Sequence, residues 1–354
     1  MYPKLALRKL SFCLLLAGIC IQGCVEPYNP GLVGQERQLV VEGNISDNIA
    51  DNVVNLTYTA GYNSEESVFS IRVRGAEVWT TNQNNVRTNW QDDGVGNFRP
   101  LSGFNPVIGE TYTLHIKTTD GSLYESNPQR LTKAPEIVNA NYQYRAVPGK
   151  ARGVFPVEIS FKDDATEDNY YQVAWKHYQL VDECGVVVSP GEGRIKPRYP
   201  CCTPCWNIDF SFGEINLSSD RFVQPGATIQ QFVSNVPFDS DSPYYLSVEL
   251  TTINKEAYTY LKLLKEQTQN TGSTFDLPPA PVRGNIFKIT NGGKESALGY
   301  FKVGGVSRKV VYVRRDNAPV AAPINEPSYY LVNECRPCQE LPTRTALRPV
   351  GWVN

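Results

Sequence analysis

Six of the nine cysteines in this sequence form its most distinctive chemical pattern, and all six lie in the second half of the chain. They are Cys184, Cys201, Cys202, Cys205, Cys335 and Cys338. An even number of cysteines in an exported chain favours a disulfide framework, although the sequence does not determine the pairing. Bridges from the 201–205 group to Cys335 and Cys338 would fasten the proline-rich end of the chain to a long loop. Such bridges would close a chain loop of more than about one hundred residues, which stabilises a fold by up to ~4–5 kcal/mol.

Two other chemistries use the same cysteines. Cys202-x-x-Cys205 and Cys335-x-x-Cys338 have the spacing of zinc ligands, but roughly 130 residues separate the pairs, where about 12–20 is usual. A redox-active CxxC needs a helix N-terminus after a strand to lower the thiol pKa. Pro204 and Pro337 lie inside the two motifs, and no such strand–helix pattern surrounds them. Disulfides are therefore the favoured interpretation, with zinc and redox chemistry as alternatives.

The first two dozen residues predict export and a lipid anchor. The basic residues Lys4, Arg8 and Lys9 precede an apolar run, Leu10–Ile21, which as a helix would rise only about 18 Å against the ~30 Å of a bilayer core. Such a segment is typical of a secretory signal peptide, here residues 1–23. It ends in Ile21-Gln22-Gly23-Cys24, which resembles a bacterial lipobox. We therefore expect Cys24 to be acylated and inserted into lipid; the alternative is a plain signal peptide with a spare thiol.

Composition excludes several function classes. The formal net charge is −2, and removal of the signal peptide takes away only bases, so the surface lacks the basic excess that nucleic acid requires. The only histidines are His115 and His177, which excludes a histidine-rich metal site. We interpret both as packing or surface residues and expect no cofactor, no metal and no nucleic-acid partner.

The pattern along the chain predicts a mainly β protein of two β-sandwich domains. Residues 24–36 form a tether rich in proline and glycine. Residues 37–133 contain short alternating strands separated by turn residues, which indicates an immunoglobulin- or fibronectin-like sandwich. The expected strands cover residues 39–41, 53–58, 68–73, 76–79 and 112–116.

Residues 134–354 are expected to form a second β-rich domain. Its predicted strands cover residues 155–161, 170–175, 244–250, 284–289, 299–303 and 310–314. One α-helix is predicted at 255–269, with Asn254 as its N-cap and an apolar stripe that includes Ala257 and Leu261. The proline-rich residues from Asn317 onwards are expected to wrap this domain as an ordered tail, fastened by disulfides.

No catalytic motif is present, so the sequence offers no catalytic residues. The acidic clusters Asp163-Asp164-Ala-Thr-Glu167-Asp168 and Asp239-Ser-Asp241 could bind calcium but lack the EF-hand spacing, and solvated turns are the preferred interpretation. A carboxylate pair for glycoside hydrolysis depends on a spatial separation that sequence does not reveal. Tryptophans could stack on sugars, but Trp79, Trp90, Trp206 and Trp352 are dispersed along the chain.

The order of several short motifs resembles Bacteroidota lipoproteins of the domain-of-unknown-function 4249 family. These motifs include Leu39-Val-Val-Glu-Gly43, Gly109-Glu-Thr-Tyr-Thr-Leu114, Cys202-Thr-Pro-Cys205-Trp206, Pro281-Val-Arg-Gly-Asn-Ile286, Cys335-Arg-Pro-Cys338 and Arg348-Pro-Val-Gly-Trp352. The extra Cys201 and the single acid, Glu26, after Cys24 depart from the family pattern. The resemblance implies no catalytic residues. It implies genes beside an outer-membrane TonB-dependent transporter, and hence an accessory role in nutrient uptake.

Three hypotheses follow. The first is a non-enzymatic outer-membrane lipoprotein, held by acylated Cys24 on one membrane face or the other, which docks on a TonB-dependent transporter or captures its ligand. The second is a surface hydrolase acting on glycans or peptides, which requires a cleft with carboxylates roughly 5–10 Å apart. The third is a structural or adhesive surface protein.

Overall fold

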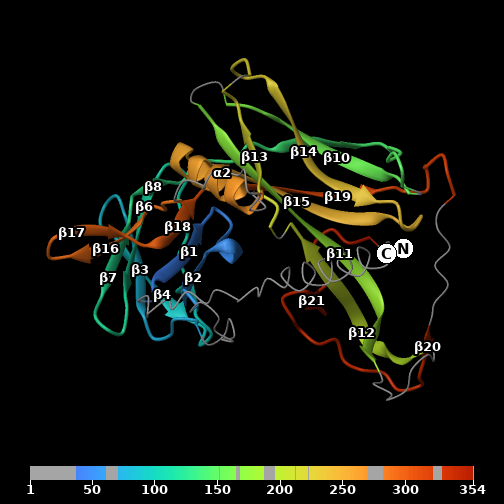
Figure 1. The fold of residues 1–354 in the computed structure, drawn as a ribbon, viewed down its shortest axis with the longest axis horizontal. Helices are drawn as coiled ribbons and strands as arrows, with labels where there is room; N and C mark the ends of the chain where they lie inside the picture. The colour runs from blue at the N-terminus through green and yellow to red at the C-terminus, as the bar shows by residue number, and fades with distance from the viewer. Residues whose placement is uncertain are drawn as a thin grey trace, which may run out of the picture. The chain divides into compact units, whose positions relative to one another are not determined.

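The computed structural model describes residues 37–60, 71–150, 152–164, 168–186, 196–211, 213–221, 223–269, 282–321 and 329–353 (Figure 1). The predicted signal peptide, Cys24 and the tether 24–36 lie outside these residues, as does part of the strand expected at 68–73. From Gln38 onwards the described residues, Ala60 apart, belong to one compact unit. None of the described helices is long and apolar enough to cross a membrane.

The protein is mainly β, as predicted, and its first sheet is a single continuous one of eleven strands. Their order is β17-β16-β7-β6-β3-β4-β5-β2-β1-β18, with β8 paired to β6. The strands are β1 (Leu39–Ile45), β2 (Val53–Tyr58), β3 (Glu77–Asn82), β4 (Arg87–Asp92), β5 (Asn97–Pro100), β6 (Thr111–Lys117), β7 (Leu123–Ser126), β8 (Gln129–Arg130), β16 (Ile286–Thr290), β17 (Gly293–Ser296) and β18 (Leu298–Val303). A short 3₁₀ helix, η1 (Ile49–Asp51), follows β1. Inward side chains of this sheet pack in one apolar core, in a barrel-like or sandwich arrangement.

Alternation along the strands builds the core of this first sheet. Side chains two residues apart share a face, and Tyr112, Leu114 and Ile116 of β6 are all buried. Gly43 occupies an inward position of β1, where an added Cβ would lie 2.8 Å from Cδ2 of Phe301. The absence of a side chain at Gly43 therefore leaves room for the fully buried Phe301 ring.

The second half of the chain forms a sandwich of two sheets. The smaller has the order β14-β10-β9, and the larger has the order β19-β15-β11-β12-β20 with β13 on β11 and β21 on β12. The strands are β9 (Ile137–Tyr142), β10 (Val154–Lys162), β11 (Tyr170–Val186), β12 (Lys196–Phe210), β13 (Asn216–Ser219), β14 (Thr228–Pro237), β15 (Tyr244–Ile253), β19 (Val306–Val313), β20 (Tyr329–Leu331) and β21 (Arg344–Thr345). Inward side chains from both sheets, among them Phe155, Phe161, Tyr171 and Leu246, pack in one core.

The predicted helix is confirmed as α2 (Lys255–Gln269). Its N-cap is Asn254, whose Oδ1 accepts a hydrogen bond from the backbone N–H of Ala257 at 2.8 Å. Ala257 is the buried residue of the helix, and Leu261 packs against the small apolar cluster that contains Ala257 and Ile253. The helix therefore docks through its first two turns.

The predicted division at residues 133 and 134 does not match the sheets. Strands β16, β17 and β18 come from the second half of the chain but pair in the first sheet, where they appear in orange among the blue and teal strands of Figure 1. Strand β18 runs parallel to β1, and its Phe301 and Val303 complete the first core. Alternation identifies a strand but not its partner, which is why the sequence suggested a contiguous first domain.

Candidate functional site

A long two-stranded hairpin extends the larger sheet of the sandwich. Strands β11 and β12 pair from Lys176↔Phe210 to Val186↔Arg198, with register shifts at Glu183. From Lys176 to Gly185 no described residue of β11 is buried. This part of β11 therefore lies outside the apolar core of the sandwich, and on the described part of β12 only Cys205 and Trp206 are buried.

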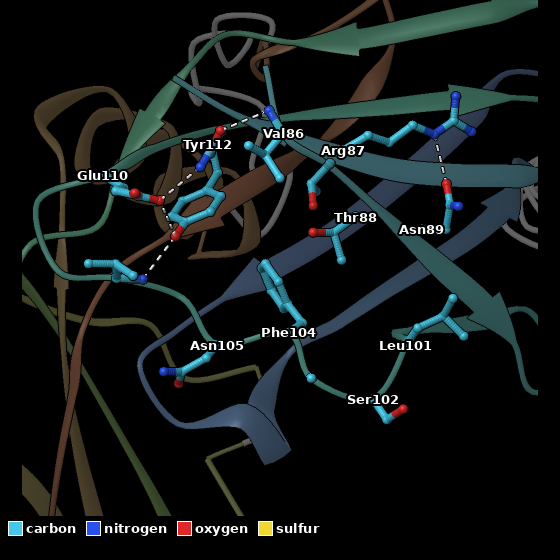
Figure 2. A pocket seen from close by; sticks show the side chains of 14 residues that line it. Val86, Arg87, Thr88, Asn89, Leu101, Ser102, Phe104, Asn105, Glu110 and Tyr112 are labelled. Carbon is cyan, nitrogen blue, oxygen red and sulfur yellow. Dashed lines mark hydrogen bonds between the residues drawn. The ribbon is translucent and has the colours of Figure 1, made fainter. Parts of the chain in front are cut away.

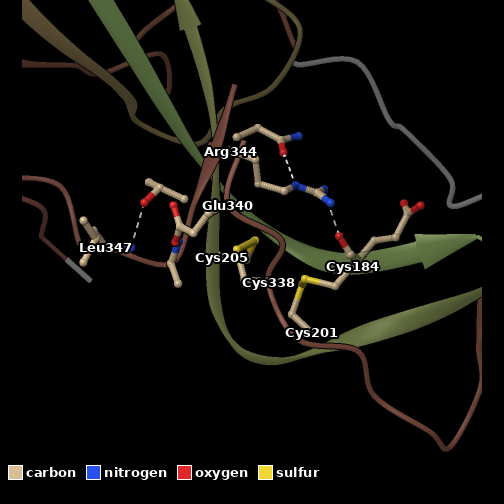
Figure 3. The surroundings of a disulfide bond; sticks show 11 residues. Cys184, Cys201, Cys205, Cys338, Glu340, Arg344 and Leu347 are labelled. Atoms are coloured by element: carbon tan, nitrogen blue, oxygen red, sulfur yellow. Dashed lines mark hydrogen bonds between the residues drawn. A yellow bond between two sulfur atoms is a disulfide. The ribbon is translucent and has the colours of Figure 1, made fainter. Parts of the chain in front are cut away.

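Three disulfides take the place of that core. Cys184 and Cys201 join the two strands with a Cα–Cα distance of 4.8 Å. Cys202–Cys335 and Cys205–Cys338 connect β12 to the last part of the chain with Cα–Cα distances of 5.0 and 5.5 Å. Figure 3 shows Cys184–Cys201 and Cys205–Cys338. The predicted disulfide fastening of the proline-rich tail is confirmed, and the structure adds the connectivity that the sequence left open.

Strand geometry explains this pairing. Consecutive side chains of a strand point to opposite faces, so the adjacent Cys201 and Cys202 bond to different partners. The tail runs parallel to β12 here: the backbone N–H of Cys202 donates to the carbonyl of Arg336, and that of Arg336 donates to Pro200. Both tail disulfides accordingly span the same separation of 133 residues.

The sulfurs of Cys184, Cys201 and Cys205 lie within 4.8 Å of one another, which is the spacing of a metal-binding cluster. It is the one such group of three among the residues that the structure describes. Each sulfur is already bonded to another sulfur, whereas zinc requires thiolates. The geometry therefore favours disulfides over the zinc alternative.

Aromatic residues hold the tail on the outer face of the sheet. The hydroxyl of Tyr245 donates to the carbonyl of Val350 at 2.7 Å, and burial raises the pKa of this tyrosine to about 12. Trp352 packs against Trp206, with ring centroids 6.0 Å apart, and against Tyr245 at 5.4 Å. These tryptophans are far apart in the sequence, and the structure brings them together beneath the tail.

The tail also contacts the hairpin through polar groups and leaves apolar groups exposed. The guanidinium of Arg344 donates to Oδ1 of Asn207 and to the carbonyl of Glu183 (Figure 3). Leu347, Val350 and Val353 are 76%, 87% and 66% exposed. These three apolar side chains are therefore accessible on a segment that disulfides hold in place.

A separate pocket of about 510 Å³ lies on the first sheet, beside the loop that follows β5 (Figure 2). Glu110 is the one carboxylate among the residues that line it, and its Oε2 accepts hydrogen bonds from the Tyr112 hydroxyl and the Asn82 amide. Burial raises the pKa of Tyr112 to about 12. A single carboxylate occupied in this way does not form the pair that glycoside hydrolysis needs.

The two histidines lie in packed surroundings. His115 stacks on Trp79 with ring centroids 5.2 Å apart, and its Nε2 shares a hydrogen bond with the Thr81 hydroxyl. His177 stacks on Tyr244 at 3.5 Å. Burial lowers the pKa of both imidazoles, so their neutral forms predominate at pH 7.

The interpretation of the acidic clusters as solvated turns is wrong for one residue. Asp163 is buried, with 6% of its surface exposed, whereas Asp168 and Asp241 are exposed as expected. Glu167 lies outside the described residues. Asp163 is buried where its carboxylate accepts a hydrogen bond from the Tyr171 hydroxyl of β11. The nearby charge of Asp220, which is distant in the sequence, was missed by sequence reasoning.

Comparison with known protein families shows which family the chain belongs to. Residues 25–310 match the family described as Domain of unknown function (DUF4249). No curated protein matches the chain.

Proposed function

Because the chain belongs to the domain-of-unknown-function 4249 family, we propose that it is a non-enzymatic lipoprotein of the outer membrane. In this proposal acylated Cys24 anchors it in lipid, and it serves a TonB-dependent transporter as an accessory or ligand-capture partner.

The observation that carries the proposal of an exported, lipid-anchored protein is the set of three disulfides. All six cysteines between residues 184 and 338 are paired with each other. Stable disulfides of this kind form in oxidising compartments outside the cytoplasm. They support the interpretation of residues 1–23 as an export signal and of Cys24 as the residue that follows cleavage.

Tethering to the membrane supports the proposed partnership with a transporter. An anchor confines the protein and a membrane transporter to one surface, which raises their effective concentration, so that a modest contact suffices. The tail offers such a contact through Leu347, Val350 and Val353, whose side chains are exposed while disulfides and tyrosines hold the backbone in place.

The experiment is purification of the chain from detergent-solubilised outer membranes, combined with palmitate labelling. We expect label on the wild-type chain, none on a Cys24→Ala variant, and a TonB-dependent transporter in the wild-type eluate alone. Absence of label from the wild type would contradict the anchor. A labelled protein recovered without any transporter would contradict the partnership. Nutrient uptake that is unchanged after deletion of the gene would instead favour the adhesive hypothesis.

A further inference from the structure

Three strand ends meet beside the core of the sandwich and bring acidic residues together. Asp163 directly follows β10, Asn169 directly precedes β11, and Asp220 directly follows β13. Strand β13 pairs with the start of β11, and the backbone N–H of Asp220 donates to the carbonyl of Asn169 at 3.2 Å. The topology therefore places two carboxylates from distant parts of the sequence around one asparagine.

The cluster is almost entirely buried. Asp163, Asn169 and Asp220 are 6%, 8% and 8% exposed. Oδ1 of Asp163 accepts from the Tyr171 hydroxyl at 3.1 Å and lies 3.5 Å from Nδ2 of Asn169. Oδ2 of Asp220 accepts from the backbone N–H of Asn169 at 2.8 Å. The second carboxylate oxygen of Asp220, Oδ1, is buried without a hydrogen-bond partner.

This arrangement lacks a positive charge. Within the described part of the chain, neither Asp163 nor Asp220 pairs with a lysine or arginine. Burial, followed by the nearby charge of Asp220, raises the pKa of Asp163. Two buried carboxylates in one cluster are costly unless hydrogen bonds, a proton or a cation compensate their charge, and the hydrogen bonds present leave Oδ1 of Asp220 without a partner.

The surrounding groups favour a cation over a proton. A proton on Asp163 would donate to a single acceptor. The carbonyl of Asp164 also faces the cluster, because it accepts from Nδ2 of Asn169 at 3.0 Å. A half-turn of the Asn169 amide would exchange this nitrogen for an oxygen. Oxygens of the Asp163 carboxylate, the Asp164 carbonyl and the Asn169 amide would then lie next to one another, and such oxygens are the ligands that Ca²⁺ prefers in proteins.

We propose that the carboxylates of Asp163 and Asp220, with the carbonyl of Asp164 and the side-chain amide of Asn169, form a calcium site. Asp163 and Asp220 supply two negative charges, which one divalent cation neutralises, and water completes the coordination. Calcium fits this irregular set better than magnesium, which demands near-ideal octahedral geometry. With only two carboxylates, the dissociation constant is on the order of 10⁻⁴–10⁻³ M, as in extracellular modules. The site links β10, β11 and β13, so bound calcium stabilises the sandwich whatever the partner of the protein is.

Terbium luminescence on the full chain, stripped of metal with a chelator, tests this site. Tb³⁺ replaces Ca²⁺ and is excited through nearby tyrosine, and the Tyr171 hydroxyl contacts Asp163 directly. We expect Tb³⁺ emission that added Ca²⁺ quenches, and at least tenfold weaker binding in Asp220→Asn. The matched control is Asp241→Asn, an exposed residue of the other acidic cluster, which should bind as the wild type does. Equal binding by Asp220→Asn and the wild type, or emission that Ca²⁺ does not displace, would overturn the site.

Thermal unfolding of the wild type provides a second test that does not depend on the folding of a variant. We expect millimolar Ca²⁺ to raise the Tm at neutral pH, and the same concentration of Mg²⁺ to raise it less. If a shared proton compensates the two charges instead, the Tm does not respond to Ca²⁺. Stability then falls as the pH rises from the ordinary aspartate range through the raised pKa of Asp163. That result would also overturn the calcium site.

Discussion

The first sheet and the hairpin of β11 and β12 are stabilised in opposite ways. The first sheet contains no cysteine among its described strands and closes on a core of fully buried side chains such as Leu56, Leu114 and Phe301. In the outer part of the hairpin only Cys205 and Trp206 are buried among the described residues, and three disulfides and the tail hold it in place. Covalent cross-links thus replace apolar burial where a segment projects beyond its core, as they do in small exported domains. The first region should therefore be insensitive to reductant and the second should depend on oxidation.

Removing both tail disulfides is expected to give the largest effect. Either disulfide closes nearly the same long loop, so a Cys202→Ser/Cys335→Ser variant still has that loop closed by Cys205–Cys338. Loop-closure entropy then predicts a loss of roughly 2–3 kcal/mol for one pair and more than about 5 kcal/mol for both. Urea unfolding of the two variants measures this difference. Equal losses in the single-pair and double-pair variants would contradict the proposed role of the long loop.

Phe301→Ala tests whether the apolar core stabilises the first sheet. The side chain is fully buried between strands of the first sheet, and its removal leaves a cavity beside Gly43, so we expect a loss of about 3–5 kcal/mol. This loss should be the same with and without reductant. Phe232→Ala, at a residue that is 39% exposed on β14, is the control and should cost much less. A reductant-dependent loss in Phe301→Ala would show that the two regions are not independently stabilised.

A smaller effect is expected at the N-terminus of α2. Replacing Asn254 with alanine removes the acceptor of the Ala257 N–H and the contact with Gln129 of β8, which should cost about 1–2 kcal/mol. Lys262→Ala, on the exposed side of the same helix, should change stability by less than about 0.5 kcal/mol. Helix content measured by circular dichroism during unfolding distinguishes the two. An unchanged midpoint in Asn254→Ala would contradict the capping role.

Local patterns in the sequence predicted the local features of this structure. Helix α2 agrees with its prediction because an N-cap and a 3.6-residue apolar period are both encoded within fifteen residues. The pairing of β18 with β1 was missed, since about 250 residues separate them and nothing in either segment specifies the other. The same limit applies to Asp220, whose surrounding residues resemble an ordinary turn, while its meeting with Asp163 follows only from the pairing of β13 with β11.

The smallest effect on stability, and the most selective effect on function, is expected at the exposed part of the tail. The side chain of Val350 is 87% exposed, while its carbonyl accepts from the Tyr245 hydroxyl, so Val350→Asp leaves that backbone bond in place and should change stability by less than about 0.5 kcal/mol. If the tail contacts a transporter, a buried charge at that interface should lower co-purification at least tenfold. Val138→Asp, at a 64% exposed position on β9, is the matched control and should co-purify as the wild type does. If both variants recover equal amounts of transporter, the tail does not form the contact. The disulfides would then serve only to stabilise the hairpin.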